Sequence, residues 1–154
     1  MPTEKLKILD ITPDAMDNGK IITAQLTLET DDGFVLNCDS DFPDEPLGAI
    51  SKKDLLLYKS RSINCNIVFV PYEKTFKINE AAERKLIQKE ATYEAEVSGE
   101  VLAEDELDNG NIKFDIDTGK FTFTLECKKK SFHPKVGEHV MANGDLRVED
   151  IELI

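Results

Sequence analysis

The sequence lacks tryptophan and has only three tyrosines beside eight phenylalanines, so few aromatic side chains are available outside a core. Its three cysteines are an odd number at wide spacing, which excludes a disulfide framework and is typical of free thiols in a reducing compartment. No apolar run is long enough to cross a bilayer, and residues 1–10 do not have the pattern of a secretory signal. We therefore expect a cytoplasmic protein without membrane contact.

Positive charge is also scarce. The chain has 19 Lys and Arg against 31 Asp and Glu, a formal net charge of −12. Nucleic-acid binding takes most of its affinity from cationic contacts to phosphate, so this balance disfavours it. The same charge attracts basic protein surfaces, although solubility alone also explains it.

The motifs of cofactor sites and catalytic centres are missing too. Neither glycine-rich phosphate-loop pattern occurs, and there is no Cys-x-x-Cys pair, so we expect no cofactor. Asp117-Thr118-Gly119 has the form of the aspartic protease motif, but the corresponding turn in the first half is Asp31-Asp32-Gly33. A hairpin turn explains both segments. Alternation places Cys38, Cys65 and Cys127 in the core, where thiols are inert.

An internal repeat is the most informative feature that is present. The segments at 14–21 and 105–112 both have the form D-x-[ML]-D-N-G-x-I. Each precedes two strand patterns, and the second strand in each half has the form F-x-L-x-C, at 34–38 and 123–127. Two matches in the same order indicate a duplication.

Period-two alternation predicts most of the strands. In the first half Ile22, Ala24, Leu26 and Leu28 are predicted to face the core. The second half is predicted to end in two short strands, which are joined by a turn at Asn143-Gly144.

The predicted element order gives the fold class, which is mainly β with short helices at about 52–59 and 80–90. Residues 1–78 and 92–154 each contain five predicted strands, and this order resembles the OB-fold, a five-stranded barrel. The resemblance implies two small OB-like barrels in tandem, with 79–91 as a linker helix. It rests on element order, so it implies nothing specific about function.

Three groups of residues are candidates for binding. The first is the pair of Asp-Asn-Gly loops, which in an OB-fold lie between strands one and two: Asp14, Asp17, Asn18, Asp105, Asp108 and Asn109. The second, for nucleic acid, is a set of lysines: Lys113, Lys128, Lys129, Lys130 and Lys135. The third, a weak candidate for Ca²⁺ or Mg²⁺, is an acidic segment with Asp39, Asp41, Asp44 and Glu45, although a solvated acidic loop is the simpler explanation.

These features favour a non-catalytic binding or assembly module. It would recognise another protein through its loops or strand edges, and the edges would also allow homo-oligomers. Two alternatives remain open at this point. One is a single-stranded nucleic acid binder, and the other is a small hydrolase or isomerase whose site the sequence does not reveal.

Overall fold

The structure of the chain is a computed structural model that describes residues 3–41, 51, 55, 57–88, 92–129 and 132–154. It is mainly β, as the alternation predicts. The ten strands of the described residues are β1 (Glu4–Asp17), β2 (Lys20–Glu29), β3 (Val35–Asp41), β4 (Ser62–Pro71), β5 (Lys77–Ile78), β6 (Lys85–Gln88), β7 (Glu94–Glu106), β8 (Asn111–Asp117), β9 (Thr122–Lys128) and β10 (His139–Leu153). No described segment forms a helix that is long and apolar enough to cross a bilayer.

Alternating apolar side chains along the strands form one core. In β8, Ile112, Phe114 and Ile116 are buried, whereas the residues between them remain partly exposed. The buried residues of both halves belong to a single cluster. Within it, the rings of Phe69 in β4 and Phe123 in β9 have centroids 5.4 Å apart, which links the two halves directly.

The alternation changes near the tip of the first hairpin. Ile22, predicted to face the core with Ala24, is 41% exposed, and Ile21 is buried instead. The cause is a shift in register, because Ala15 pairs with Thr23 while the next residue of β1 pairs with Ile21. This β-bulge turns Ile22 outward.

The strand pairings close into a ring. Each half contributes a three-stranded meander, β1–β2–β3 and β7–β8–β9. Strand β4 pairs antiparallel with β1 and parallel with β9, and β10 pairs antiparallel with β7 and parallel with β3. Strands β4 and β10 also pair with each other, so the two of them together close each meander.

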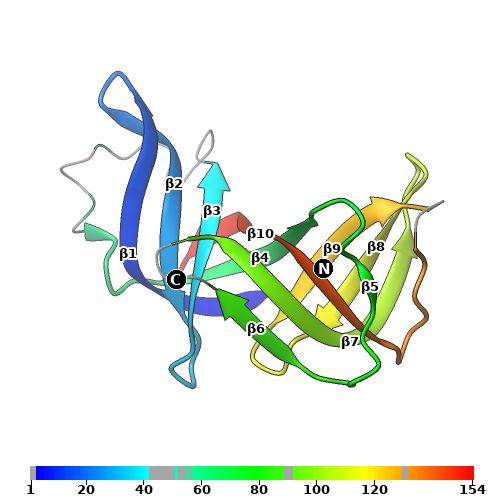
Figure 1. Cartoon of the computed structure of the whole chain (residues 1–154). Coiled ribbons are helices and arrows are strands. Elements are labelled where there is room, and N and C mark those ends of the chain that lie inside the picture. The colour runs from blue at the N-terminus through cyan, green and yellow to red at the C-terminus, as the bar shows by residue number, and fades with distance from the viewer. Residues whose placement is uncertain (1–2, 42–50, 52–54, 56, 89–91, 130–131) are drawn as a thin grey trace.

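The two halves therefore form one hydrogen-bonded network, and two separate barrels in tandem are not shown. Figure 1 shows β1, β2 and β3 at one end of the molecule, β7, β8 and β9 at the other, and β4 and β10 between them. The physical reason is the length of β10, which pairs with β7 through its first part and with β4 through its second. The boundaries predicted at 78 and 92 stay a prediction.

The predicted turn at Asn143-Gly144 is wrong, because β10 continues through it. Gly144 is needed for a different reason. A Cβ at this position would lie 2.1 Å from the carbonyl oxygen of Val70 and 2.8 Å from the Cα of Pro71. The missing side chain lets β10 pass directly against the end of β4.

We expect Gly144→Ala to lower the free energy of unfolding by about 3 kcal/mol or more, because the added methyl group overlaps backbone atoms that have little room to move. Chemical denaturation measures this change. The matched control is Asn143→Ala, an exposed neighbour, which should cost less than about 0.5 kcal/mol. Equal stability of Gly144→Ala and the wild type would contradict the close approach of the two strands.

The linker helix predicted over 80–90 is also wrong for the described residues 80–88, which hold a turn and strand β6. In this turn Asn79 Oδ1 accepts a hydrogen bond from the N–H of Ala81 at 3.1 Å. Ala82 then has φ +53°, which ends the turn. Leu86 packs against the core from β6, which pairs with β7. This arrangement is more stable than a short isolated helix, which is marginal in water. Residues 89–91 lie outside the described residues.

The helix predicted over about 52–59 falls partly on residues 52–54 and 56, which lie outside the described residues. Leu55 and Leu57 have a 3₁₀ conformation, and a turn follows at 58–60. This turn ends at Ser60, which has φ +69° and donates its N–H to the carbonyl of Ile8 at 2.7 Å. An α-helix is therefore not shown among the described residues of this segment.

The side chain of Gln88 connects the end of β6 to β3. Its Oε1 accepts a hydrogen bond from the N–H of Asn37 at 2.8 Å, and its Nε2 donates to the carbonyl of Asn37 at 2.8 Å. The amide thus takes the place that a peptide group of a neighbouring strand would fill. It joins the two ends of the molecule outside the β4–β10 contact.

We expect Gln88→Ala to lower the free energy of unfolding by about 1–2 kcal/mol, because it removes two hydrogen bonds and leaves the Asn37 peptide groups without these partners. Urea denaturation would measure the loss. Gln25→Ala, on β2, serves as the control for the same loss of an amide side chain. If both variants cost the same, Gln88 does not connect β6 to β3.

Candidate functional site

The two Asp-Asn-Gly loops are the tips of hairpins at opposite ends of the molecule (Figure 1). Asn18 and Gly19 have positive φ, as does Gly110, and Asn109 Oδ1 accepts a hydrogen bond from the N–H of Asn111 at 3.0 Å. The six predicted binding residues are all exposed: Asp14, Asp17, Asn18, Asp105, Asp108 and Asn109. Turn geometry accounts for their sequence, and the structure does not bring the two tips together.

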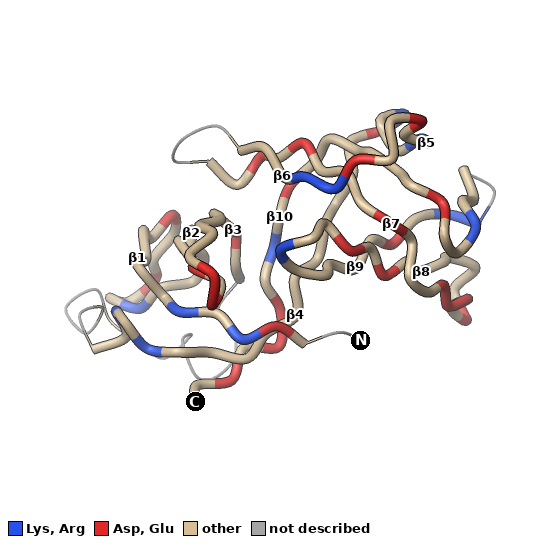
Figure 2. Tube along the Cα trace, turned by 90° about the horizontal axis from the view of Figure 1, so that it is seen from below, with Lys and Arg blue, Asp and Glu red and all other residues tan. Residues whose placement is uncertain are grey.

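Two lysines of the predicted patch, Lys113 and Lys129, lie beside carboxylates. Lys113 lies between Asp105 and Glu126 in the strand register, and Lys129 Nζ is 3.1 Å from a carboxylate oxygen of Glu106. The remaining lysines of the patch are exposed where described, Lys128 and Lys135, whereas Lys130 lies outside the described residues. Figure 2 shows Asp and Glu positions beside Lys positions at this end.

The acidic segment is only partly described. Asp39 and Asp41 belong to β3, while Asp44 and Glu45 lie outside the described residues. Within the part of the chain that the structure describes, no three His, Cys, Asp or Glu side chains are grouped so as to hold a metal ion.

Two of the three cysteines are buried core residues. Cys38 and Cys65 are fully buried, and burial raises the pKa of Cys65 to about 12 and that of Cys38 well above its ordinary value. Cys127 was predicted to be a core residue as well, but it is only half-buried, because it lies near the end of β9. Its pKa is also raised by burial.

The carboxylates of the two Asp-containing turns bond within their own turns, and that of Asp32 also reaches the other turn. Asp117 Oδ1 accepts a hydrogen bond from the N–H of Gly119 at 2.8 Å. Asp32 accepts one from Thr30 and forms an ion pair with Lys120 at 3.0 Å, and these two contacts lower the pKa of Asp32. The carboxylates thus stabilise turns, as the hairpin interpretation holds.

The turn after β4 presents an exposed tyrosine in a fixed position. The N–H of Tyr72 donates to the carbonyl of Asn143 at 2.7 Å, and Thr75 Oγ1 accepts from the N–H of Asn143 at 3.1 Å. The Tyr72 hydroxyl donates to Asp145 Oδ1 at 2.5 Å. The backbone N–H and the hydroxyl of Tyr72 are therefore both bonded to β10, although Tyr72 is 42% exposed.

A hollow of about 370 Å³ lies beside this tyrosine, and we call it the Tyr72 groove. Its lining residues are Tyr72, Ile87, Glu94, Ala95, Glu96 and Asn143. The strand register explains the set, because Glu96 in β7 lies between Ile87 in β6 and Asn143 in β10. Ile87 is 50% exposed, so the groove combines apolar surface with two carboxylates.

The electrostatic environment of the groove is negative. The hydrogen bond to Asp145 raises the pKa of Tyr72 well above its ordinary value. The charge of Asp39 is the main cause of the raised pKa of Tyr93, to which burial and Asp145 also contribute. None of the lining residues is Lys or Arg, so a cationic group is favoured here.

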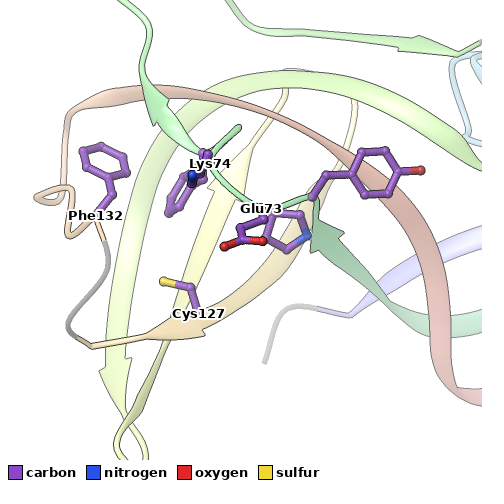
Figure 3. Close-up of a pocket in the computed structure, with 7 residues that line it drawn as sticks. Glu73, Lys74, Cys127 and Phe132 are labelled. Atoms are coloured by element: carbon purple, nitrogen blue, oxygen red, sulfur yellow. The ribbon is translucent and has the colours of Figure 1, made fainter.

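A second hollow of about 350 Å³ also includes Tyr72, and we call it the Phe132 pocket. Its lining residues are Pro71, Tyr72, Glu73, Lys74, Phe76, Cys127 and Phe132. Figure 3 shows Glu73 and Lys74 on the turn after β4, Cys127 at the end of β9, and Phe132 on the segment that follows β9. The ring of Phe76 contacts that of Phe132 edge-on, with centroids 4.9 Å apart.

Sequence reasoning assigned the residues of both hollows to other roles. Ile87 falls in the helix predicted over about 80–90 and Cys127 in the predicted core, while segment 71–74 was not singled out. The available signal was an aromatic residue in a turn, since Tyr72 is one of only three tyrosines. The sequence could not show that Glu94 and Glu96 lie near Tyr72, because β7 and the turn are brought together by their separate contacts with β10.

No family model matches the chain, and no curated protein matches it. Among solved structures, the chain is similar to one described as "Structural mimicry for functional antagonism". The alignment covers 99% of this chain and 92% of that chain, with 9% identity and a TM-score of 0.31. A likeness of this size carries no argument about fold or function.

We expect Tyr72→Phe to change how stability depends on pH. The pKa of Tyr72 is raised in the folded state from its ordinary value of 10.0, so its contribution is fully present below pH 10 and is lost as pH rises through the folded-state value. The variant should be less stable by about 1 kcal/mol at neutral pH, and the gap should narrow in alkali. Urea denaturation across this range tests it, with Tyr58→Phe as control. A gap independent of pH would contradict the bond to Asp145.

Proposed function

We propose that this chain is a non-catalytic binding module that recognises a positively charged segment of a partner protein in the Tyr72 groove. The observation that carries the proposal is the composition of the groove, in which apolar surface from Ile87 lies beside Glu94 and Glu96 and no lining residue is basic. A lysine or arginine side chain matches this combination, because its stem is apolar and its end is cationic.

The fixed position of Tyr72 supports the same proposal. Its hydroxyl is bonded to Asp145, and its backbone is bonded to β10, so little side-chain entropy remains to be lost on binding. Tyrosine also offers a large contact area and attracts cations to its ring face. The net charge of −12 would increase the rate of encounter with a basic partner.

We also propose that the strand ring consists of two intertwined OB-like barrels. The circuits β1–β2–β3–β10–β4 and β7–β8–β9–β4–β10 each contain a meander of three strands, closed by two further strands of which one is parallel to the third. This arrangement resembles the five-stranded OB-fold. In this proposal β4 and β10 are shared, and the Tyr72 groove lies where β10 passes from one barrel to the other.

Single-stranded nucleic acid binding stays an alternative prediction without a specific observation in its favour. Carboxylates face Lys113 and Lys129, whereas Lys128 lies opposite Asn111. The release of counterions from phosphate needs lysines that are not already compensated. A small hydrolase or isomerase also stays a prediction only.

A direct test uses a short peptide with a Lys-Ser-Ser core and its counterpart in which glutamate replaces lysine. We expect the lysine peptide alone to bind, and Glu94→Gln/Glu96→Gln to weaken its affinity by about tenfold, because two carboxylates next to the cation are lost. NMR titration at low and high salt would locate the site and show screening.

The matched control is Asp105→Asn/Asp108→Asn, which removes the same charge at the tip of the β7–β8 hairpin. At high salt this variant should change the affinity by less than about twofold, since neither residue lines the groove and screening weakens distant charges. Equal weakening by both variants would show that only net charge matters, and the groove would then not be the site.

A further inference from the structure

The Phe132 pocket differs in character from the Tyr72 groove beside it. Its charged lining residues, Glu73 and Lys74, have opposite signs, so they give no preference for a charged ligand. The other lining residues are Pro71, Tyr72, Phe76, Cys127 and Phe132. An apolar group is the occupant that this lining favours.

The walls of the pocket are already ordered by aromatic contacts. Phe76 meets Phe132 at 4.9 Å between centroids and the buried Phe114 at 5.9 Å, so the aromatic wall is anchored in the core. Lys74, in the turn that borders the pocket, has φ +66°, an uncommon conformation for a lysine. A pocket with ordered walls can take an apolar group without rearrangement.

From these observations we propose that the Phe132 pocket receives an apolar side chain of the same partner segment whose cation lies in the Tyr72 groove. The inference rests on the proposed function, because it assumes a bound protein segment. Tyr72 lines both hollows. In an extended segment alternate side chains lie about 7 Å apart, so a basic residue and an apolar residue two positions away can occupy hollows that share one wall.

The charged lining residues also indicate which side chain each hollow prefers. The groove has Glu94 and Glu96 with no basic lining residue, whereas the charges of Glu73 and Lys74 in the pocket offset each other, so a cation gains little there. The two sites therefore discriminate between a basic and an apolar residue rather than accepting either at both positions.

Cys127 provides a direct readout of the pocket. It lines the pocket and is half-buried, whereas Cys38 and Cys65 are fully buried. Alkylation by iodoacetamide should therefore modify Cys127 first. Because burial raises the pKa of this thiol, the reaction is best followed at mildly alkaline pH.

The experiment compares two peptides that differ at one position, with Lys-Ser-Phe and Lys-Ser-Ser cores. We expect phenylalanine to increase affinity by about tenfold or more, the gain that burial of such a side chain gives. The phenylalanine peptide should also slow alkylation of Cys127 at saturation, and the serine peptide should not. Both measurements use the full chain.

A filled pocket should abolish this preference. Cys127→Leu places a larger apolar side chain in the pocket, so the difference in affinity between the two peptides should fall to less than about twofold. Val35→Leu makes a comparable change at an exposed position on β3 and should retain the full difference. Thermal unfolding would confirm that both variants fold.

The outcomes separate this inference from the proposed function. Equal binding of both peptides at the Tyr72 groove, without protection of Cys127, would overturn the inference and leave the proposed function intact. Failure of both peptides to bind would overturn both. Protection of Cys127 by free phenol, with no gain in affinity from phenylalanine in the peptide, would show a site for a small apolar ligand and would also overturn the inference.

Discussion

The antiparallel pairing of β4 with β10 is the contact on which the rest of the structure depends. It places Phe69 opposite Leu146 and Ile67 opposite Val148, and all four side chains are buried. Each strand also borders a meander of the other half, so neither half closes its core alone. The partners are far apart in sequence, and the loop-closure cost must be offset by the burial of one shared core.

The candidate site follows from this pairing. Because Gly144 lies against the carbonyl of Val70, the chain that leaves β4 stays next to β10, and Tyr72 reaches both Asn143 and Asp145. The pairing of β10 with β7 then places Glu94 and Glu96 on the other side. Residues from three distant parts of the chain thus meet to form the groove.

The local part of the fold could be predicted from the sequence, and the non-local part could not. Alternation correctly placed Ala24, Leu26 and Leu28 in the core, because the inward face of a strand is decided by neighbouring residues. Gly144 was misinterpreted because Asn-Gly favours a turn locally, while its role is to admit Val70 from another strand. The spacing of Leu86 and its apolar neighbours suits a helix as well as a strand. The segment forms a strand because it pairs with β7, a non-local contact.

The repeat explains why the site was harder to predict than the core. The duplicated segments, with their Asp-Asn-Gly tips and F-x-L-x-C strands, became hairpins and core strands, which any folded β protein needs. Tyr72, Phe76 and Ile87 belong to the segment between the two repeats. Strand pairing fixes this segment at two places, where β5 pairs with β10 and β6 pairs with β7. Exposed residues of a connecting segment that a rigid framework positions are often those that bind, and a repeat pattern does not reveal them.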